Sequence, residues 1–529
     1  MVSRKNAEQA ITVVIFCLIR ANKLTLVLLV SGLISILPGC GKKSDSFEAG
    51  AYAIDISPQI LPAIRNGSFT QRMEDQVLDP LHARCFVFKS GEETVAIAVV
   101  DSCMIPREVC NQAKRLANAQ TGIPVDRILI ASTHTHSAPG VMNLCLGSSS
   151  DSNYEKFLPP KLAEGIIRAF ANLEPARIGW TVVDAPEHTH CRRWLKHPDH
   201  FAEDPFGETT VRAMMHPGYQ NPEYIGEAGP VDSGLSLLSI QSVKGGRPIG
   251  LLANYSMHYF GVSGGFSADY YGLFSGLMEQ KIAETPQANP AFVAAMSQGT
   301  SGDLHWMDYS KPKKENYTIE QYASELAEIA FSAYQEIDYE TNVTPLAMAE
   351  TAIHLNRRMP DPDRIAWATD LNQKRGDRRP ENRPEVYAEQ AAWFVENPRE
   401  ELILQAIRIG ELAITAIPNE VYGITGLKLK AQSPFRTTFN MELANGAAGY
   451  IPPPEQHFLG GYTTWPARTA GLEPDAEPVI VDTLLGLLEE LSGLKRRPLK
   501  TDFYNAQQRE AINQAKADNN NRVNRGMAP

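Results

Sequence analysis

Apolar runs rich in β-branched residues recur along this chain and constrain its fold more than any other feature. They include residues 94–101 (TVAIAVVD), 128–132 (ILIAS) and 248–255 (PIGLLANY). Continuous apolar runs of this length predict strands that are buried on both faces. A helical pattern at residues 106–122 lies between the first two runs. This alternation predicts an α/β fold with mixed β-sheets covered by helices.

No long linker rich in glycine, serine or proline divides the chain after residue 50. With 529 residues, of which 43% are hydrophobic, the chain can bury one large core, and we expect a single catalytic domain over residues 51–495. Residues 361–385 are charged and interrupted by prolines, which is typical of a surface insertion. Residues 496–529 form a polar C-terminal tail that we expect to fray.

The formal net charge of −11 is unfavourable for a nucleic-acid partner. Phosphate contacts require clustered lysine and arginine side chains, and the sequence has no basic stripe interleaved with aromatic residues. We therefore expect no binding to nucleic acid.

Residues 1–39 are typical of a signal peptide for export. Basic residues precede an apolar run of about 15 residues, which ends in small residues before Cys40. The motif LPGC resembles a bacterial lipobox, which implies cleavage before Cys40 and a lipid on its thiol, with residues 40–50 as a tether to a membrane surface. Because Pro38 is unusual in a lipobox, an uncleaved amino-terminal anchor is the alternative. Both readings predict an exported protein anchored on the periplasmic or cell-surface side of a bacterial membrane.

Two histidines stand where one of the predicted strands should end, in the stretch THTHSAPG. In an extended strand, residues two apart point to the same side, so the imidazoles of His134 and His136 could face one metal ion. The cysteines beyond the signal segment are odd in number and form no CxxC motif, which makes a zinc–thiolate site a poor fit. Any metal must therefore be bound by histidine and carboxylate.

His258 and Glu420 also follow apolar strands. In α/β sheets, ligands bind beyond the carboxyl ends of the strands. Two histidines and a glutamate from separate strands are a suitable ligand set for a catalytic zinc. Taken singly, His258 could be a hydrogen-bonded core histidine, and Glu420 could merely favour the amino end of a helix. Together with His134 they predict a zinc site at the carboxyl ends of the strands.

Four motifs, in order and spacing, resemble the neutral/alkaline non-lysosomal ceramidases, which are secreted zinc amidases. The motifs are THTHSAPG, NYSMH, PNEVYG and NGAAGYIPPPEQHFLGGY, and the resemblance extends from residue 51 to about residue 490. It implies that His134, His258 and Glu420 bind zinc, with Tyr450 of GYIPP as a further ligand.

The resemblance also implies the catalytic residues. His136 matches the second histidine of THTH, Arg192 of HCRRW lies where the family has Asn-Arg-Ser, and Tyr462 matches a tyrosine downstream of the ligand tyrosine. Asp303 is retained from the family's Gly-Asp-Val-Ser-Pro segment, but His305 replaces the serine that is a proposed nucleophile. We expect Asp303 to orient a ligand or His305, and His305 to pass a proton to the leaving amine.

These observations predict an exported hydrolase that uses Zn²⁺ to cleave an N-acyl, ceramide-like lipid amide. One alternative is a metal-dependent esterase or phosphoesterase, because GDLH has the Asp-x-His spacing of binuclear sites, although the accompanying Gly-Asn-His-Glu type of segment is missing. The other is a lipid-anchored binding protein that keeps the fold without catalysis.

Overall fold

The computed structural model describes residues 46–143, 146, 148–283, 290–341, 343 and 345–524. Its contacts separate Met1–Ser46 from Phe47–Pro529, and the fold described below is that of the second unit. The predicted signal peptide and Cys40 lie outside the described residues. No helix in the described part of the chain is both long and apolar enough to cross a membrane.

Eight strands form the larger sheet. In spatial order they are β16 (Val293–Gln298), β15 (Pro248–Tyr255), β14 (Gly234–Ser242), β7 (Glu174–Asp184), β1 (Phe47–Asp55), β4 (His82–Ser90), β5 (Glu93–Val100) and β6 (Ile128–Ser132). Neighbours pair antiparallel except β15 with β16 and β5 with β6, which pair in parallel. The three apolar runs predicted as strands are β5, β6 and β15, and the predicted mixed sheet is confirmed.

A second sheet has four strands. They are β18 (Leu346–Asn356), β19 (Arg399–Ile409), β20 (Leu412–Ala416) and β22 (Thr437–Met441), and only β20 and β22 pair in parallel. Short strands form smaller ladders: β2 (Ala63–Arg65) with β3 (Arg72–Glu74), β8 (His190–Cys191) with β17 (Leu304–His305), β9 (Arg193–Lys196) with β12 (Ala213–Met215) and β13 (Tyr224–Glu227), β10 (Ala202–Glu203) with β11 (Thr209–Val211), and β21 (Glu420–Val421) with β23 (Tyr450–Ile451).

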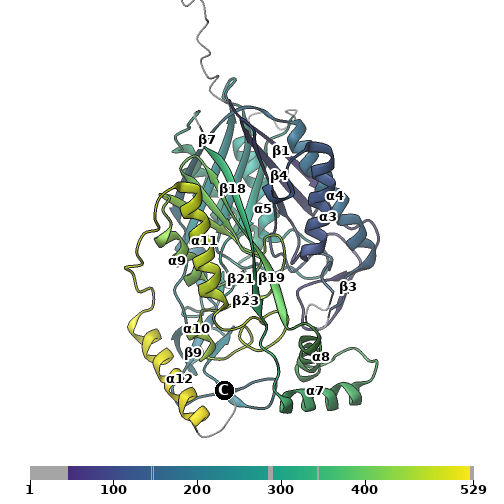
Figure 1. The fold of residues 1–529 in the computed structure, drawn as a ribbon, viewed down its shortest axis with the longest axis vertical. Helices are drawn as coiled ribbons and strands as arrows, with labels where there is room; N and C mark the ends of the chain where they lie inside the picture. The colour runs from purple at the N-terminus through teal and green to yellow at the C-terminus, as the bar shows by residue number, and fades with distance from the viewer. Residues whose placement is uncertain are drawn as a thin grey trace, which may run out of the picture. The chain divides into compact units, whose positions relative to one another are not determined.

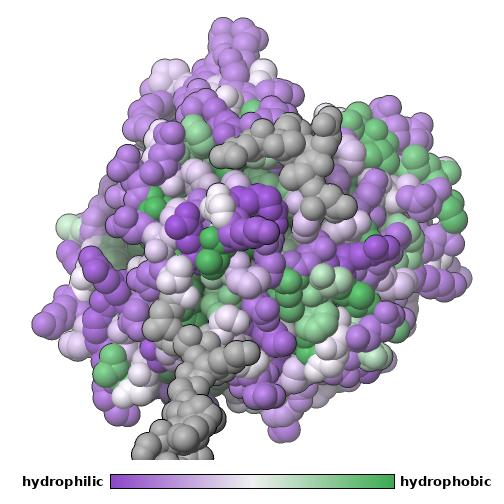
Figure 2. All heavy atoms as spheres, turned by 90° about the horizontal axis from the view of Figure 1, so that it is seen from above, coloured by the Kyte–Doolittle hydropathy of each residue, from purple (hydrophilic) through white to green (hydrophobic). Residues whose placement is uncertain are grey.

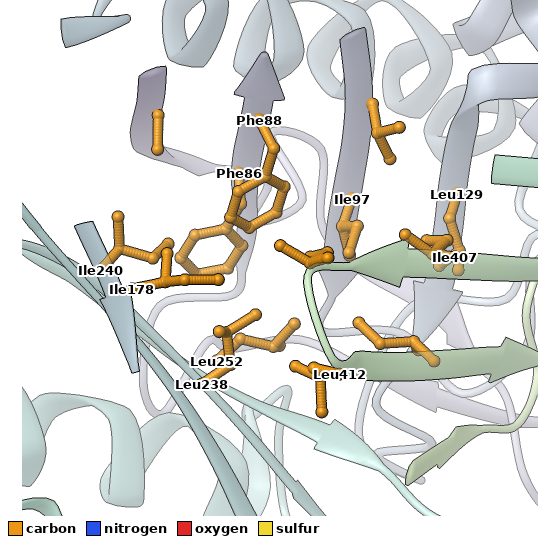
Figure 3. Packing of buried hydrophobic residues seen from close by; sticks show 14 of the residues in the cluster. Phe86, Phe88, Ile97, Leu129, Ile178, Leu238, Ile240, Leu252, Ile407 and Leu412 are labelled. Carbon is orange, nitrogen blue, oxygen red and sulfur yellow. The ribbon is translucent and has the colours of Figure 1, made fainter. Parts of the chain in front are cut away.

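The two large sheets pack face to face over a shared core. Figure 3 shows Phe86 and Phe88 of β4 on the same side of the sheet, in the core that also contains Ile407 and Leu412 of the second sheet. Alternate residues of β4, such as Val87, face the helices instead. Because side chains alternate along a strand, a strand covered on both faces must be apolar at every position. This explains the continuous apolar runs in the sequence.

Helices cover the outer faces of both sheets (Figure 1). Helices α3 (Arg107–Thr121) and α4 (Ser152–Ala171) pack on β4 and β5, and α5 (Asp269–Ile282) and α6 (Ile319–Gln335) pack on β14, β15 and β16. Helices α9 (Gly423–Gln432) and α11 (Ala476–Ser492) cover the second sheet. The layers are therefore helix, sheet, sheet and helix, which confirms the predicted α/β class.

The charged, proline-broken segment that we predicted to be a surface insertion is largely helical. Helix α7 (Pro362–Arg375) buries only Ala368, and it is followed by α8 (Arg383–Glu396). Asp361 caps α7 because its carboxylate accepts the backbone N–H of Arg364, and a proline is tolerated in the first turn of a helix. The segment is thus helical but exposed, as a surface insertion should be.

The expectation that the C-terminal tail frays is wrong as far as Asn524. Helix α12 (Ala506–Asn524) buries Ile512 and Ala515 against the region around β9 and the short helix α10 (Pro454–His457). The side-chain amides of Gln507 and Gln508 donate to backbone carbonyls of β13. Because α12 docks partly through these polar contacts, its sequence does not show the apolar periodicity that would have predicted a packed helix.

Exposed apolar side chains are spread over the surface. On the face shown in Figure 2, they occur in small groups separated by polar residues. Scattered apolar side chains of this kind are normal on protein surfaces.

Candidate metal centre and active site

Backbone hydrogen bonds join the two large sheets at the carboxyl ends of their strands. The N–H of Ser132, at the end of β6, donates to the carbonyl of Leu443 at 3.1 Å. The N–H of Glu442, which follows β22, donates to the carbonyl of Gln298 at the end of β16, at 3.2 Å. The N–H of Leu443 also donates to the carbonyl of Asn419 at 3.1 Å, and β16 pairs with β15. The segments that carry His134, His258 and Glu420 are thereby held close together.

Four of the predicted site residues meet at one buried point. The Nε2 atom of His134 lies 3.1 Å from Nε2 of His258, 3.1 Å from Nε2 of His136 and 3.3 Å from Oε2 of Glu420. His134, His258 and Glu420 form a group whose ligand atoms all lie within 4.8 Å of one another, and Cys103 forms a second group with His134 and His136. The cluster therefore has donor atoms suited to one metal ion.

The hydrogen bonds around the rings fix which nitrogen carries a proton. Nδ1 of His134 lies 2.9 Å from the carbonyl of Cys103, and Nδ1 of His136 lies 3.0 Å from the carbonyl of Gly67. Each Nδ1 must donate, which leaves a lone pair on each Nε2 when the ring is neutral. Nε2 of His258 accepts from the guanidinium of Arg192 at 3.2 Å, so it also carries a lone pair.

Three nitrogen lone pairs thus converge with a carboxylate. Both side-chain oxygens of Glu420 are buried, and neither has a hydrogen-bond partner among the described residues. Acceptors that face one another in a buried site repel unless a cation lies between them. Imidazole nitrogens and a carboxylate oxygen are ligands that zinc prefers, so the residues present fit a bound zinc.

The pKa values of the three histidines also indicate a site suited to a cation. Burial lowers the pKa of His134, but Cys103 and Glu420 raise it more, to well above its ordinary value. Burial, reinforced by Arg192 and His134, holds the pKa of His136 and of His258 well below the ordinary value. The cluster therefore favours a positive charge beside Glu420 but resists protonation of the other two rings.

The backbone at His134 differs from the prediction. Strand β6 ends at Ser132, and His134 has a φ of 72°, in the left-handed region, so the prediction that His134 and His136 share one side of an extended strand is wrong. A backbone N–H bond from His134 to the carbonyl of Ser102 holds this turn. The turn, rather than strand alternation, brings the two rings together, with centroids 4.6 Å apart. Conformations of this kind concentrate at functional sites.

Two neighbours hold the ring of His136. Gly67 has a φ of 87°, and a Cβ atom there would lie 2.6 Å from the imidazole, so only glycine allows this approach. The ring of Tyr259 stacks on that of His136, with centroids 3.9 Å apart and planes at 20°. Nothing in the sequence marks Tyr259 except its position directly after His258.

Glu420 and Tyr450 lie side by side because β21 and β23 pair in parallel with these residues in register. Gly449 has a φ of 76°, and a Cβ atom there would lie 2.4 Å from the backbone of Thr469. The hydroxyl of Tyr450 lies 3.0 Å from that of Tyr462. Both predicted tyrosines therefore belong to the cluster: β21–β23 pairing places Tyr450 beside Glu420, and Tyr462 joins through its contact with the Tyr450 hydroxyl.

Arg192 links the tyrosines to the histidines. Its Nη2 lies 2.8 Å from the carbonyl of Gly302, 3.1 Å from the hydroxyl of Tyr450 and 3.2 Å from Nε2 of His258, and its two protons are shared among these three acceptors. Its side chain is buried, and its Nε has no partner in the described part of the structure. Although burial lowers the pKa of Arg192, Tyr462 and Tyr450 raise it above the ordinary value, so the guanidinium stays charged.

A chain of hydrogen bonds on the side of Arg192 away from His258 holds its guanidinium in place. Nη1 of Arg192 lies 3.5 Å from Nε2 of His216, and Nδ1 of His216 lies 2.6 Å from the hydroxyl of Tyr309. Because arginine can only donate, His216 must donate from Nδ1, and the Tyr309 hydroxyl then donates to the sulfur of Met307 at 3.0 Å. Burial and Arg192 lower the pKa of His216 to about 3, so it is neutral at pH 7. No strand or motif marks His216 in the sequence.

Asp303 binds backbone rather than a ligand side chain. Its Oδ1 accepts the N–H of Gly423, at the start of α9, at 2.8 Å, and its carbonyl accepts the N–H of Arg192 at 2.9 Å. Its Oδ2 is buried without a partner in the described residues, and burial raises the pKa of Asp303 to about 6. Asp303 therefore positions the segment after Glu420, instead of orienting a ligand or His305 as we expected.

His305 lies at the edge of the cluster, on the two-residue strand β17. Its ring centroid is 5.3 Å from that of His216 and 5.5 Å from that of Tyr259. Its Nδ1 is buried and has no partner within the described residues. Burial, together with His216 and Arg192, holds the pKa of His305 well below its ordinary value, so the imidazole is neutral at pH 7.

A further buried carboxylate, that of Glu442, supports the ligand segments, and no motif marks it in the sequence. It accepts the N–H of Val421 at 2.6 Å and the hydroxyl of Ser301 at 2.7 Å. The hydroxyl of Ser301 lies 3.5 Å from Nδ1 of His258. Burial raises the pKa of Glu442 to about 8. Groups that orient metal-binding side chains in this way affect metal affinity without touching the ion.

Comparisons with known proteins agree with this arrangement. Residues 70–306 match the family model described as neutral/alkaline non-lysosomal ceramidase, N-terminal. That range contains His134, His136, Arg192, His258, Asp303 and His305, whereas Glu420, Tyr450 and Tyr462 lie beyond it. No curated protein matches the sequence.

Two solved structures share the fold. The crystal structure of neutral ceramidase from Pseudomonas aeruginosa aligns with a TM-score of 0.62 at 16% identity, covering 87% of this chain and 77% of that one. A ceramidase complexed with C2 aligns with the same TM-score and coverage at 17% identity. The chain thus has the neutral ceramidase fold, and its resemblance to the neutral/alkaline non-lysosomal ceramidase family is confirmed.

Proposed function

We propose that this protein is a zinc-dependent hydrolase that cleaves the amide bond of an N-acyl, ceramide-like lipid. The observation that carries the proposal is the meeting of three imidazole nitrogens with the buried carboxylate of Glu420, which accepts no hydrogen bond within the described residues, directly beside the charged guanidinium of Arg192. The match to an amide-hydrolase family over residues 70–306 supports the choice of an amide substrate.

His134, His258 and Glu420 would hold the zinc, and Tyr450 would lie beside it. A zinc ion in such a site supplies Lewis acidity toward the amide carbonyl and makes water acidic enough to react near neutral pH. The carbonyls of Cys103 and Gly67 accept from Nδ1 of His134 and His136, so each Nε2 faces the centre with a lone pair when its ring is neutral. His136 is then an acceptor that can receive a hydrogen bond or a proton at Nε2.

Arg192, Tyr450 and Tyr462 are the donors available to the oxygen on which negative charge develops. Nη2 of Arg192 lies 3.1 Å from the hydroxyl of Tyr450, and that hydroxyl lies 3.0 Å from the hydroxyl of Tyr462. A preorganised donor of this kind is worth roughly 3 kcal/mol in the transition state, because it needs no reorganisation when charge appears. The carbonyl of Gly302 and the ring of His216 keep Arg192 in place.

The test of this proposal is turnover of a lipid amide. Purified protein loaded with zinc should release dodecanoic acid from N-dodecanoyl-sphingosine, lose this activity with a chelator and regain it with added zinc. The matched dodecanoyl ester and a phosphodiester should be cleaved more slowly. Zinc-loaded protein that cleaves only the ester or the phosphodiester would favour those alternatives, and zinc-loaded protein that cleaves none would favour a binding protein.

His305 provides a separate prediction. Because its imidazole is neutral at pH 7, we expect it to act as a hydrogen-bond donor rather than as the general acid predicted from the sequence. His305→Ala should lower kcat while zinc stays bound, by up to about 100-fold for a lost polar contact in the transition state. His305→Gln, whose amide can still donate, should recover most of that loss.

The two roles of His305 are separated by the pH dependence of kcat. If both variants are equally slow and one limb of the pH profile disappears, His305 transfers a proton, and the donor role is wrong. If both variants retain full activity, His305 only fills space beside Trp306.

We also propose that the protein is exported and held at a membrane surface by a lipid on Cys40. The support is the LPGC motif that precedes a polar tether. Mass spectrometry of the mature protein should show a lipid-modified Cys40 at its amino terminus, and Cys40→Ser should leave the precursor unprocessed. An unmodified chain cleaved elsewhere would contradict this.

A further inference from the structure

A cavity of about 920 Å³ lies in a part of the molecule that the proposed reaction does not use. It is open to solvent on one side, and its walls come from the β10–β11 hairpin, the segment between β18 and α7, helix α8, the end of α10 with the loop that follows it, and helix α12. None of the nine predicted site residues lines it. Its volume is within the range of pockets that bind small molecules.

Aromatic side chains form much of the wall. Phe394 of α8 is fully buried and Trp465 nearly so, and both line the cavity together with Phe206 and Phe458. These rings come from separate segments, which gives the cavity apolar surface on more than one side. An apolar chain or ring system would be the favoured occupant of such a space.

A cation without a carboxylate partner also lines this cavity. The guanidinium of Arg358 donates to the carbonyl of Ala470, while its Nε is buried and has no partner among the described residues. Burial lowers the pKa of Arg358 to about 10, and no carboxylate offsets that effect. The group is nevertheless charged at pH 7, and a part-buried charge that lacks a counter-ion is stabilised by an anion beside it.

His457 stands beside this cation with a free nitrogen. Its Nδ1 is buried and unpartnered in the described part of the chain, and it lines the same cavity. Burial and the positive charge of Arg358 lower the pKa of His457 to about 3, so the ring is neutral. Arg358 is therefore the charge that an anionic ligand would meet, with a neutral imidazole next to it.

The remaining charged groups limit how much negative charge the cavity accepts. Arg212 pairs with Asp518, and Arg364 stacks on the ring of Phe206 at 3.3 Å. Asp204, Glu208 and Asp361 also line the cavity. These carboxylates would repel a dianion such as a phosphate monoester. A monoanion bound to Arg358 carries half that charge, so its repulsion by the same carboxylates would be half as large.

We propose that this cavity binds an amphiphilic carboxylate. Its single carboxylate would pair with the guanidinium of Arg358, and its apolar chain would lie against Phe394 and Trp465. The carboxylate matches the planar fork of arginine and supplies the counter-ion that the site lacks. This proposal does not depend on the proposed hydrolysis, because the cavity and the metal centre have no predicted site residue in common.

The experiment uses the intact protein and dodecanoate below its critical micelle concentration. Calorimetry should show binding, with a change in tryptophan fluorescence from Trp465. Arg358→Gln should weaken binding at least tenfold, and Arg358→Lys, which keeps the charge but not the fork, should weaken it less. Arg378→Gln removes an equal charge from an exposed loop outside the cavity and should change nothing. Dodecanol and dodecyl phosphate should bind at least tenfold more weakly than dodecanoate.

A variant at another position tests the cavity independently of the Arg358 variants, in case those do not fold. Thr209→Trp adds bulk at an exposed position of the cavity wall and removes no buried contact, so it should also weaken dodecanoate binding while amide hydrolysis is unchanged. Dodecanoate binding that survives both Arg358→Gln and Thr209→Trp lies elsewhere, for example at the metal centre, and overturns the proposal. Dodecyl phosphate that binds as tightly as dodecanoate overturns the assignment to a carboxylate.

Discussion

Glu420→Ala is expected to remove most of the bound zinc and to abolish amide hydrolysis. Glu420 is the only carboxylate in the cluster with His134 and His258, and both its oxygens lack a hydrogen-bond partner in the described structure. Loss of a residue that only orients a ligand typically costs about 10- to 100-fold in metal affinity, and loss of a ligand should cost at least that. Zinc content per chain and kcat on the lipid amide measure the two effects.

His134→Ala and His258→Ala should have the same effects, and Glu442→Gln is the matched control. Glu442 is another buried carboxylate near the cluster, but it binds Ser301 and the backbone of Val421, and glutamine keeps its acceptor oxygen. We expect Glu442→Gln to retain most of the zinc. Full zinc content in the three ligand variants would disprove this metal site.

His136→Ala distinguishes the two overlapping groups of donor atoms. If zinc is held by His134, His258 and Glu420, this variant keeps its metal and loses activity. If zinc is instead held by Cys103, His134 and His136, the same variant loses its metal while Glu420→Ala keeps it. The geometry favours the first group, because Nδ1 of His134 is engaged by the carbonyl of Cys103 and only its Nε2 is free for a metal.

The parts of the fold that the sequence predicted are those with a repeated apolar pattern. Strands β5, β6 and β15 and helix α3 were recognised because burial on both faces of a sheet, or on one face of a helix, leaves a period in the sequence. The convergence of His134, His258 and Glu420 followed from their position after such strands. Resemblance to a family added Arg192, Tyr450 and Tyr462, which no pattern would have indicated.

What could not be predicted depends on contacts between distant segments. The left-handed turn at His134 is held by the carbonyl of Ser102, and His216 reaches Arg192 from a loop that has no periodicity. Helix α12 docks partly through glutamine amides that bind backbone carbonyls, so its polar sequence suggested a frayed tail. Such contacts become visible only when the chain is folded, because neither partner has a local signal.

Arg192→Lys is expected to lower kcat by about 10²- to 10³-fold, the effect of losing one oxyanion donor, while zinc content and KM change little. The Nη2 atom of Arg192 contacts His258, Gly302 and Tyr450 at once, and its Nη1 faces His216. Lysine keeps the charge, but a point charge on a flexible stem cannot hold all of these positions. The expected fall in kcat would therefore result from lost orientation of the donor groups, because the positive charge is retained.

Tyr309→Phe tests the same orientation without touching the cluster. Removing the hydroxyl leaves Nδ1 of His216 without its acceptor, so the ring is free to turn away from Arg192. We expect kcat to fall by about tenfold at unchanged zinc content, because small displacements of a positioned group reduce the rate even when binding persists. His216→Asn, which offers an amide oxygen to Arg192, should be less harmful than His216→Ala. If Arg192→Lys is as active as the unmodified protein, the guanidinium is not an oxyanion donor, and its contacts serve only to hold His258 and Tyr450 in place.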